Sequence, residues 1–151
     1  MFKKILVPVD GSTTSNRGLL EAVKLAKAQK ATLIVLHVVD ENIVTQSALG
    51  GGYFIEGLLE GLLENGKKLL AKSVLEAKKQ RVKVQPVLIE DIGMAVSDVI
   101  VSQAKKLKAD VIVLGTHGRR GVSRLLMGSD AEGVVRAATV PVLLVRAPGK
   151  R

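Results

Sequence analysis

The sequence predicts an α/β fold, in which one domain is built on an open, doubly wound, parallel sheet with helices on both faces. Five short runs rich in Val, Ile and Leu are continuously apolar, as strands buried on both faces are. Segments with helical spacing of apolar residues lie between them, which gives the order βαβαβαβαβ and, with right-handed crossovers, a mostly parallel sheet. The 151 residues suit a single domain, residues 1–151, large enough to bury a substantial core.

The five predicted strands are the apolar runs themselves. They are ILVPV (5–9), TLIVLHV (32–38), VKVQPVLI (82–89), DVIVLG (110–115) and VPVLLV (140–145). The last run would form a sheet edge that only Pro141 protects, and an apolar edge usually finds a partner. We therefore expect a homodimer that pairs residues 141–146 of two copies in antiparallel fashion.

Each of the four predicted helices carries a stripe of apolar residues at helical spacing. The stripes are Leu19, Ala22, Val23 and Ala26; Ile55, Leu58, Leu59, Leu62, Leu63, Leu69 and Leu70; Val96, Val99, Ile100, Ala104 and Leu107; and Ala131, Val134, Val135 and Ala138. The stretch SALGGGY (47–53) resembles a linker, so we expect residues 41–57 to be mobile.

Composition excludes several classes of function. The chain has no cysteine, hence no disulfide or thiolate site, and its two histidines are too far apart to suggest zinc. No apolar run reaches about 18 residues, which predicts a cytoplasmic protein without a membrane segment. The net charge of +9 is concentrated in residues 67–83, which indicate a solvated helix face. Three aromatic residues are too few to stack bases, which disfavours single-stranded nucleic acid as a partner.

The loop GTHGRRGVSRLLMGSDAEGVV (115–135) is the most specific feature. Gly115, Gly118 and Gly128 are followed by Ser129, which opens a helix. Glycines admit close approach to a ligand, and amides at a helix N-terminus attract anions, so phosphate is the natural ligand. The chain contains neither a GxxxxGK[ST] P-loop nor GxGxxG after its first strand, which favours a mononucleotide.

Ligands of open parallel sheets bind beyond the carboxyl ends of the strands, where the winding direction reverses. Asp10 ends the first run, and the glycine loop follows the fourth. If the fourth strand lies beside the first, Asp10 and Gly115 face each other across that point.

The segments ILVPVDGS, LHVVDE, ADVIVLGTHGRRGVSRLLMGSDAEGVVR and PVLLVR resemble the universal stress protein family, in its subfamily with the motif G-x2-G-x9-G-[ST]. The resemblance implies strand order 3-2-1-4-5, a homodimer, and ATP at the motif, in a signalling or stress-response protein that is not an efficient enzyme. Residue by residue, Pro8 and Asp10 match the adenosine end, Val38 matches the residue whose backbone meets adenine, and the motif residues match the ribose and phosphate contacts. The expected cofactor-binding set is Pro8, Val9, Asp10, Val38, Leu114, Gly115, His117, Gly118, Arg119, Gly128, Ser129 and Asp130.

Several of these residues also have a purely structural interpretation. Asp10 is a common turn former, and Pro8 could mark a strand that ends at Val7. Ser129 and Glu132 fit a capping box, and the loop arginines fit solvated charges, of which one could clamp a phosphate. Asp130 departs from the family pattern, where a small or apolar residue is usual. His37 is interpreted as a core histidine without a chemical role.

Two classes of function remain open. The favoured one is a regulatory module that binds ATP, ADP or AMP, with or without Mg²⁺, and the alternative is a slow ATP hydrolase or a self-phosphorylating switch. No catalytic residue is assigned. Nucleic-acid binding, which rests on charge alone, is disfavoured.

Overall fold

The computed structural model of the chain describes residues 1–47, 55–91, 93–117 and 127–146. Five parallel strands form one sheet in the order β3-β2-β1-β4-β5, which confirms the predicted class and strand order. The strands are β1 (Lys4–Pro8), β2 (Thr32–Asp40), β3 (Lys83–Asp91), β4 (Val111–Gly115) and β5 (Val142–Val145). The helices are α1 (Thr13–Gln29), α2 (Asn42–Ser47), α3 (Ile55–Lys79), α4 (Val96–Leu107) and α5 (Ser129–Ala137).

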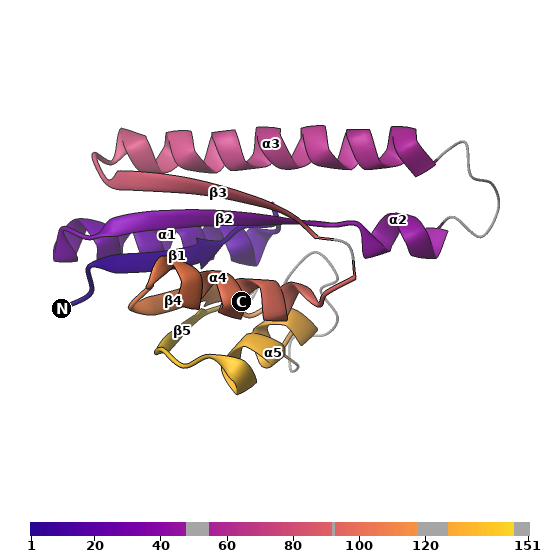
Figure 1. Cartoon of the computed structure of the whole chain (residues 1–151). Coiled ribbons are helices and arrows are strands. Elements are labelled where there is room, and N and C mark those ends of the chain that lie inside the picture. The colour runs from indigo at the N-terminus through magenta and orange to yellow at the C-terminus, as the bar shows by residue number, and fades with distance from the viewer. Residues whose placement is uncertain (48–54, 92, 118–126, 147–151) are drawn as a thin grey trace, which may run out of the picture.

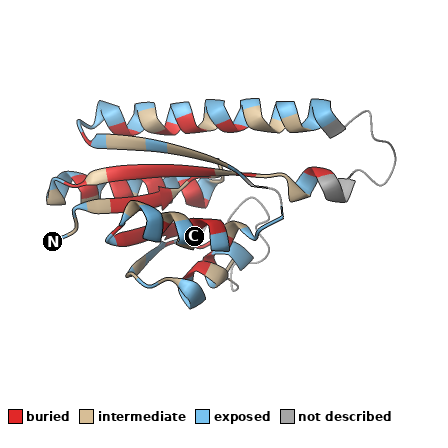
Figure 2. Ribbon diagram, in the orientation of Figure 1, coloured by how far each residue is buried: buried red, intermediate tan, exposed pale blue. Residues whose placement is uncertain are grey.

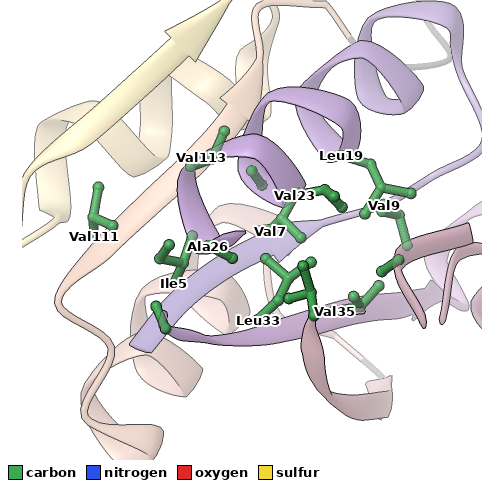
Figure 3. Packing of buried hydrophobic residues seen from close by; sticks show 14 of the residues in the cluster. Ile5, Val7, Val9, Leu19, Val23, Ala26, Leu33, Val35, Val111 and Val113 are labelled. Carbon is green, nitrogen blue, oxygen red and sulfur yellow. The ribbon is translucent and has the colours of Figure 1, made fainter. Parts of the chain in front are cut away.

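Helices cover both faces of the sheet, because the central strands are apolar on both sides. In β1, Ile5 and Val7 pack in one core cluster with α1 and α3, whereas Leu6 packs in a second cluster with α4 and α5. The same alternation places Val113 of β4 in the first cluster and Ile112 in the second. Figure 3 shows the first cluster, and Figure 1 shows α1 behind the sheet with α4 and α5 in front of it.

The segment expected to be mobile is partly helical. Residues 42–47 form α2, and α3 begins at Ile55, while residues 48–54 lie outside the described part of the chain. The apolar stripe predicted for this helix is not buried along its first turns, and Leu58 is 50% exposed. Figure 1 gives the reason, because these turns extend past the end of the sheet and lie over α2.

The second half of α3 covers β2 and β3. Its buried residues recur at helical spacing, at Gly66, Leu70, Ser73 and Ala77. Figure 2 shows the buried segments of this helix on the side that faces the sheet. The lysines of this half lie on the opposite, solvated side, where Lys67 pairs with the exposed Glu64 at 3.3 Å. Within the described ranges, no helix is long and apolar enough to cross a membrane.

Candidate functional site

The switch point of the sheet lies between β1 and β4, which are neighbours. From β1 the chain enters α1 on one face, and from β4 it reaches α5 on the other face. The carboxyl ends of these two strands therefore form the place where ligands bind in open parallel sheets. Those predicted site residues that the structure describes lie on or directly beside the ends of β1, β2 and β4 and the start of α5, at this edge.

Pro8 separates β1 from β4 at the switch point. The strand ends at Pro8 and not at Val7. Val9 N donates to Leu36 O of β2 at 2.8 Å. Successive residues of a strand direct their main-chain groups to opposite sides, so the main-chain groups of Pro8 face β4. Proline has no amide to donate there. The β1–β4 pairing accordingly stops at Leu6–Ile112, whereas the pairing with β2 continues to Pro8.

The turn after β1 is closed by polar side chains. Asp10 Oδ1 accepts from Ser12 N at 2.8 Å, and Asp10 N donates to Ser15 Oγ at 3.0 Å. Ser12 Oγ in turn accepts from Ser15 N at 3.2 Å and caps α1, while Gly11 supplies a φ of 82°. The turn-forming interpretation of Asp10 is thus correct. Ser12 and Ser15 were not among the predicted site residues, although GSTTS directly after the strand is a capping signal.

Gly115 has a packing role that the sequence pattern alone does not reveal. A Cβ at this position would lie 2.6 Å from Thr14 C, 2.7 Å from Thr14 O and 2.9 Å from Ser15 N. These are main-chain atoms of the first turn of α1, which no rotamer change can move away. The first glycine of the motif therefore allows α1 to pack closely on the end of β4.

Thr116 joins the end of β4 to the start of α5. Its amide donates to Val145 O at 3.0 Å, and its carbonyl accepts from Gly128 N at 2.8 Å. The glycine loop thus leaves β4 and returns to the same strand end. Gly118, Arg119 and the other loop arginines lie outside the described residues.

His117 lies next to this junction. Its Nδ1 is 3.0 Å from Thr116 Oγ1, whereas its Nε2 is shielded from solvent and has no hydrogen-bond partner in the described part of the chain. Burial of a polar atom without a hydrogen-bond partner costs free energy, and this one lies at the candidate site, where a ligand could supply the partner.

The start of α5 differs from the predicted capping box. The N-cap residue is Gly128, and the first helical bond runs from Glu132 N to Gly128 O at 2.9 Å. The predicted box is wrong because the bond to Thr116 places Gly128 before the helix and makes Ser129 its first residue. The Glu132 carboxylate accepts instead from Arg136 Nη2 at 2.7 Å. Ser129 and Asp130 are exposed in the first turn.

Gly128 leaves α5 without a side-chain cap. Its φ of −62° and ψ of 154° suit any residue, so the backbone does not require glycine here. Ser, Thr, Asp or Asn would normally occupy this position and accept a hydrogen bond from a first-turn amide. A glycine leaves room for an external acceptor at the positive end of the helix dipole.

Three further predicted residues can offer a ligand only main-chain groups. Val9 is 3% exposed and Leu114 is 5% exposed, and each packs in a core cluster. Val38 packs against the second cluster. Because Leu36 O faces β1, the main-chain groups of Val38, two residues later, face the same side, beyond the end of β1.

Comparisons with known proteins match this architecture over nearly the whole chain. A family model described as "Universal stress protein family" matches residues 1–146. The chain belongs to the universal stress protein family. It is 37% identical over 151 residues to universal stress protein MJ0531 of Methanocaldococcus jannaschii, an alignment that covers 99% of this chain and 85% of the relative.

Solved structures of the family have the same fold. The structure of MJ0577, also from M. jannaschii, superposes with a TM-score of 0.85 and 27% identity and covers 99% of both chains. A universal stress protein from Archaeoglobus fulgidus, solved in complex with dAMP, superposes with a TM-score of 0.66 and 26% identity, covering 95% of this chain and 97% of that one.

Proposed function

We propose that this universal stress protein binds an adenine nucleotide, in the first instance ATP, at the switch point, and that its nucleotide state regulates another component of a stress response. The observation that carries the proposal is Gly128, a cap residue that leaves the first turn of α5 to an external acceptor where the β1 and β4 ends separate. The dAMP complex of the A. fulgidus relative supports a nucleotide as that acceptor.

The residues divide between the two ends of the nucleotide. The turn at Pro8–Asp10 and the main chain of Val38 take the adenosine, and the first turn of α5 takes phosphate oxygens through its amides. The loop residues Gly118 and Arg119, with Gly115 and Ser129, complete the phosphate side. The Nε2 of His117 provides one more polar group for a ligand here.

Mg²⁺ is proposed to arrive with the nucleotide. The described residues contain no group of three His, Cys, Asp or Glu side chains that could hold a metal ion. The phosphates would therefore supply most of its oxygen ligands. Asp130, in the first turn of α5, would either add a carboxylate ligand to Mg²⁺ or repel the γ-phosphate.

Binding is tested by thermal unfolding with and without ATP. A ligand that binds only the native state at about 100 times its Kd adds roughly 2.7 kcal/mol of stability. Gly118→Val and Gly128→Val should abolish this stabilisation, because each side chain fills space near the phosphates. If both variants fold and keep wild-type ATP affinity, the motif is not the site.

Gly128→Asp is a sharper variant, because aspartate is a good cap that accepts from the amides needed by phosphate. It should leave the stability of the ligand-free protein unchanged or raise it by a few tenths of a kcal/mol. It should nevertheless remove the response to ATP. Gly128→Asn separates capping from charge, and unaltered ATP binding by both variants would contradict the assignment of these amides.

We propose a binding module as the primary activity. The alternative, a slow hydrolase or self-phosphorylating switch, is decided by incubating the protein with labelled ATP for an hour and measuring released and protein-bound phosphate. Stoichiometric retention of intact ATP supports the module, and accumulation of either product supports the alternative.

We also propose a homodimer that pairs residues 141–146 across the β5 edge. In β5, Leu143 is 43% exposed and Leu144 is 38% exposed, although the two side chains alternate along the strand. The opposite edge, β3, carries Pro86 in its middle, which discourages pairing with another strand. Because β3 is protected by a proline and β5 exposes leucines, association through the β5 edge is favoured.

A further inference from the structure

His37 of β2 is buried beside the adenosine end of the proposed site. It is 7% exposed, and its Nδ1 lies 2.7 Å from Val9 O. A carbonyl can only accept, so Nδ1 carries the hydrogen and donates it to Val9. The ring therefore holds the main chain directly before Asp10.

This hydrogen bond replaces a bond of the β-ladder. Since Val9 N donates to Leu36 O, a regular parallel ladder would next direct the amide of Val38 to Val9 O. The carbonyl accepts from the His37 ring instead. An imidazole at this position thus satisfies the buried carbonyl and leaves the Val38 amide available to a base beyond the end of β1.

Helix α3 confines the ring from its other side. A Cβ added at Gly66 would lie 2.9 Å from Cδ2 and 3.0 Å from Nε2 of His37, and 3.1 Å from a methyl carbon of Val39. The helix approaches β2 closely at this glycine, and the ring has no room to shift toward α3. Val9 is fixed in turn in the first core cluster (Figure 3).

We infer that His37 is a positioning residue for adenosine recognition: clamped by α3 at Gly66, it satisfies the Val9 carbonyl and keeps the Val38 main chain open to the adenine. The inference rests on the proposed nucleotide site and adds to it a residue that touches no ligand. The inference also makes adenosine affinity depend on how closely α3 packs against β2 at Gly66.

The test compares two ligands in calorimetric titrations. AMP reports the adenosine end together with one phosphate, and inorganic tripolyphosphate reports the phosphate end alone. His37→Leu should weaken AMP binding about tenfold, which corresponds to the loss of one buried hydrogen bond. The same variant should bind tripolyphosphate with an affinity within about twofold of wild type. His37→Asn, whose side-chain amide can donate near the position of Nδ1, should restore AMP affinity to within about threefold of wild type.

Gly66→Ala tests the clamp without removing the donor, and Gly61→Ala is its matched control. Both replace a glycine of α3 with the better helix former, but a Cβ at Gly61 has no atom within 4 Å. Gly66→Ala should weaken AMP binding severalfold with tripolyphosphate unaffected, and Gly61→Ala should change neither affinity.

The outcomes separate this inference from the proposed function. If the wild type binds neither AMP nor tripolyphosphate, the proposed site fails. If the wild type binds both, the inference is overturned when folded His37→Leu retains AMP affinity or loses both ligands equally. Should His37→Leu not fold, Gly66→Ala decides, and AMP affinity equal to that of Gly61→Ala overturns the inference.

Discussion

Replacing Gly115 with alanine should destabilise the folded protein even without a ligand. The new Cβ would lie 2.6 Å from Thr14 C, roughly 0.8 Å short of ordinary van der Waals contact at 3.4 Å. All three of the nearest atoms belong to the main chain of α1, so the helix as a whole or the end of β4 must move.

The magnitude follows from two opposing terms. Overpacking of a well-packed interior costs about 1–3 kcal/mol, and loss of a glycine from a strand returns about 0.5–1 kcal/mol. Because the overlap is with main-chain atoms, the overpacking cost lies in the upper part of its range, about 2–3 kcal/mol, and the net loss is on the order of 1–2 kcal/mol. For a chain of this length each kcal/mol shifts Tm by about 2–4 °C, so Tm should fall by roughly 2–8 °C.

Differential scanning calorimetry and urea unfolding of the ligand-free protein measure this loss, with Gly57→Ala as control. A Cβ at Gly57 meets no atom within 4 Å, so this variant should be as stable as wild type or more stable by up to about 1 kcal/mol. If Gly115→Ala keeps the wild-type Tm but loses nucleotide binding, Gly115 serves the ligand and the packing explanation is refuted.

Three further predictions concern the edge strand, the nucleotide preference and the pH dependence. Leu143→Lys should convert the dimer to a monomer at micromolar concentration in light scattering, and a wild-type monomer would reject the β5 interface. Asp130→Val should tighten ATP more than AMP if carboxylate repulsion of the γ-phosphate dominates, by up to several kcal/mol at an effective dielectric near 20. If Asp130 holds Mg²⁺, the same change should weaken ATP only when magnesium is present, and titrations in magnesium and in chelator distinguish the two. Backbone amides of Lys4 and Lys3 hold the pKa of the Asp110 carboxyl below its usual value. A carboxyl whose pKa is lowered in the folded protein stabilises the fold at pH values above its pKa in the unfolded chain, so Asp110→Asn should destabilise the protein at pH 7. The cost should be less than about 1 kcal/mol, because the carboxylate is exposed. In urea unfolding the difference should begin to shrink as the pH falls below about 4 and should disappear once the pH lies below the lowered pKa of the folded state. A difference that does not shrink on acidification would contradict this origin.

The fold class and the edge of the sheet that carries the candidate site residues could be predicted from the sequence, because both depend on short-range patterns. A strand buried on both faces must be apolar throughout, so runs such as TLIVLHV identify the central strands without knowledge of their neighbours. A polar turn or a glycine loop directly after such a run necessarily lies at the carboxyl edge of the sheet. Pro8, Asp10 and Gly115 were located in this way.

The structural roles of individual residues required the tertiary structure, because each depends on a partner far away in the sequence. Ser129 satisfies the local capping pattern, but the bond from Gly128 to Thr116 makes the glycine the cap. The stripe of α3 has helical spacing throughout, yet its first turns find no strand to cover. In the sequence, His37 cannot be distinguished from any other histidine in an apolar strand. The structure distinguishes it, because Val9 O lies 2.7 Å from its ring and α3 approaches the ring at Gly66. A sequence pattern indicates which face of an element is apolar or where a chain can turn, whereas packing at van der Waals distance decides which atom meets that face.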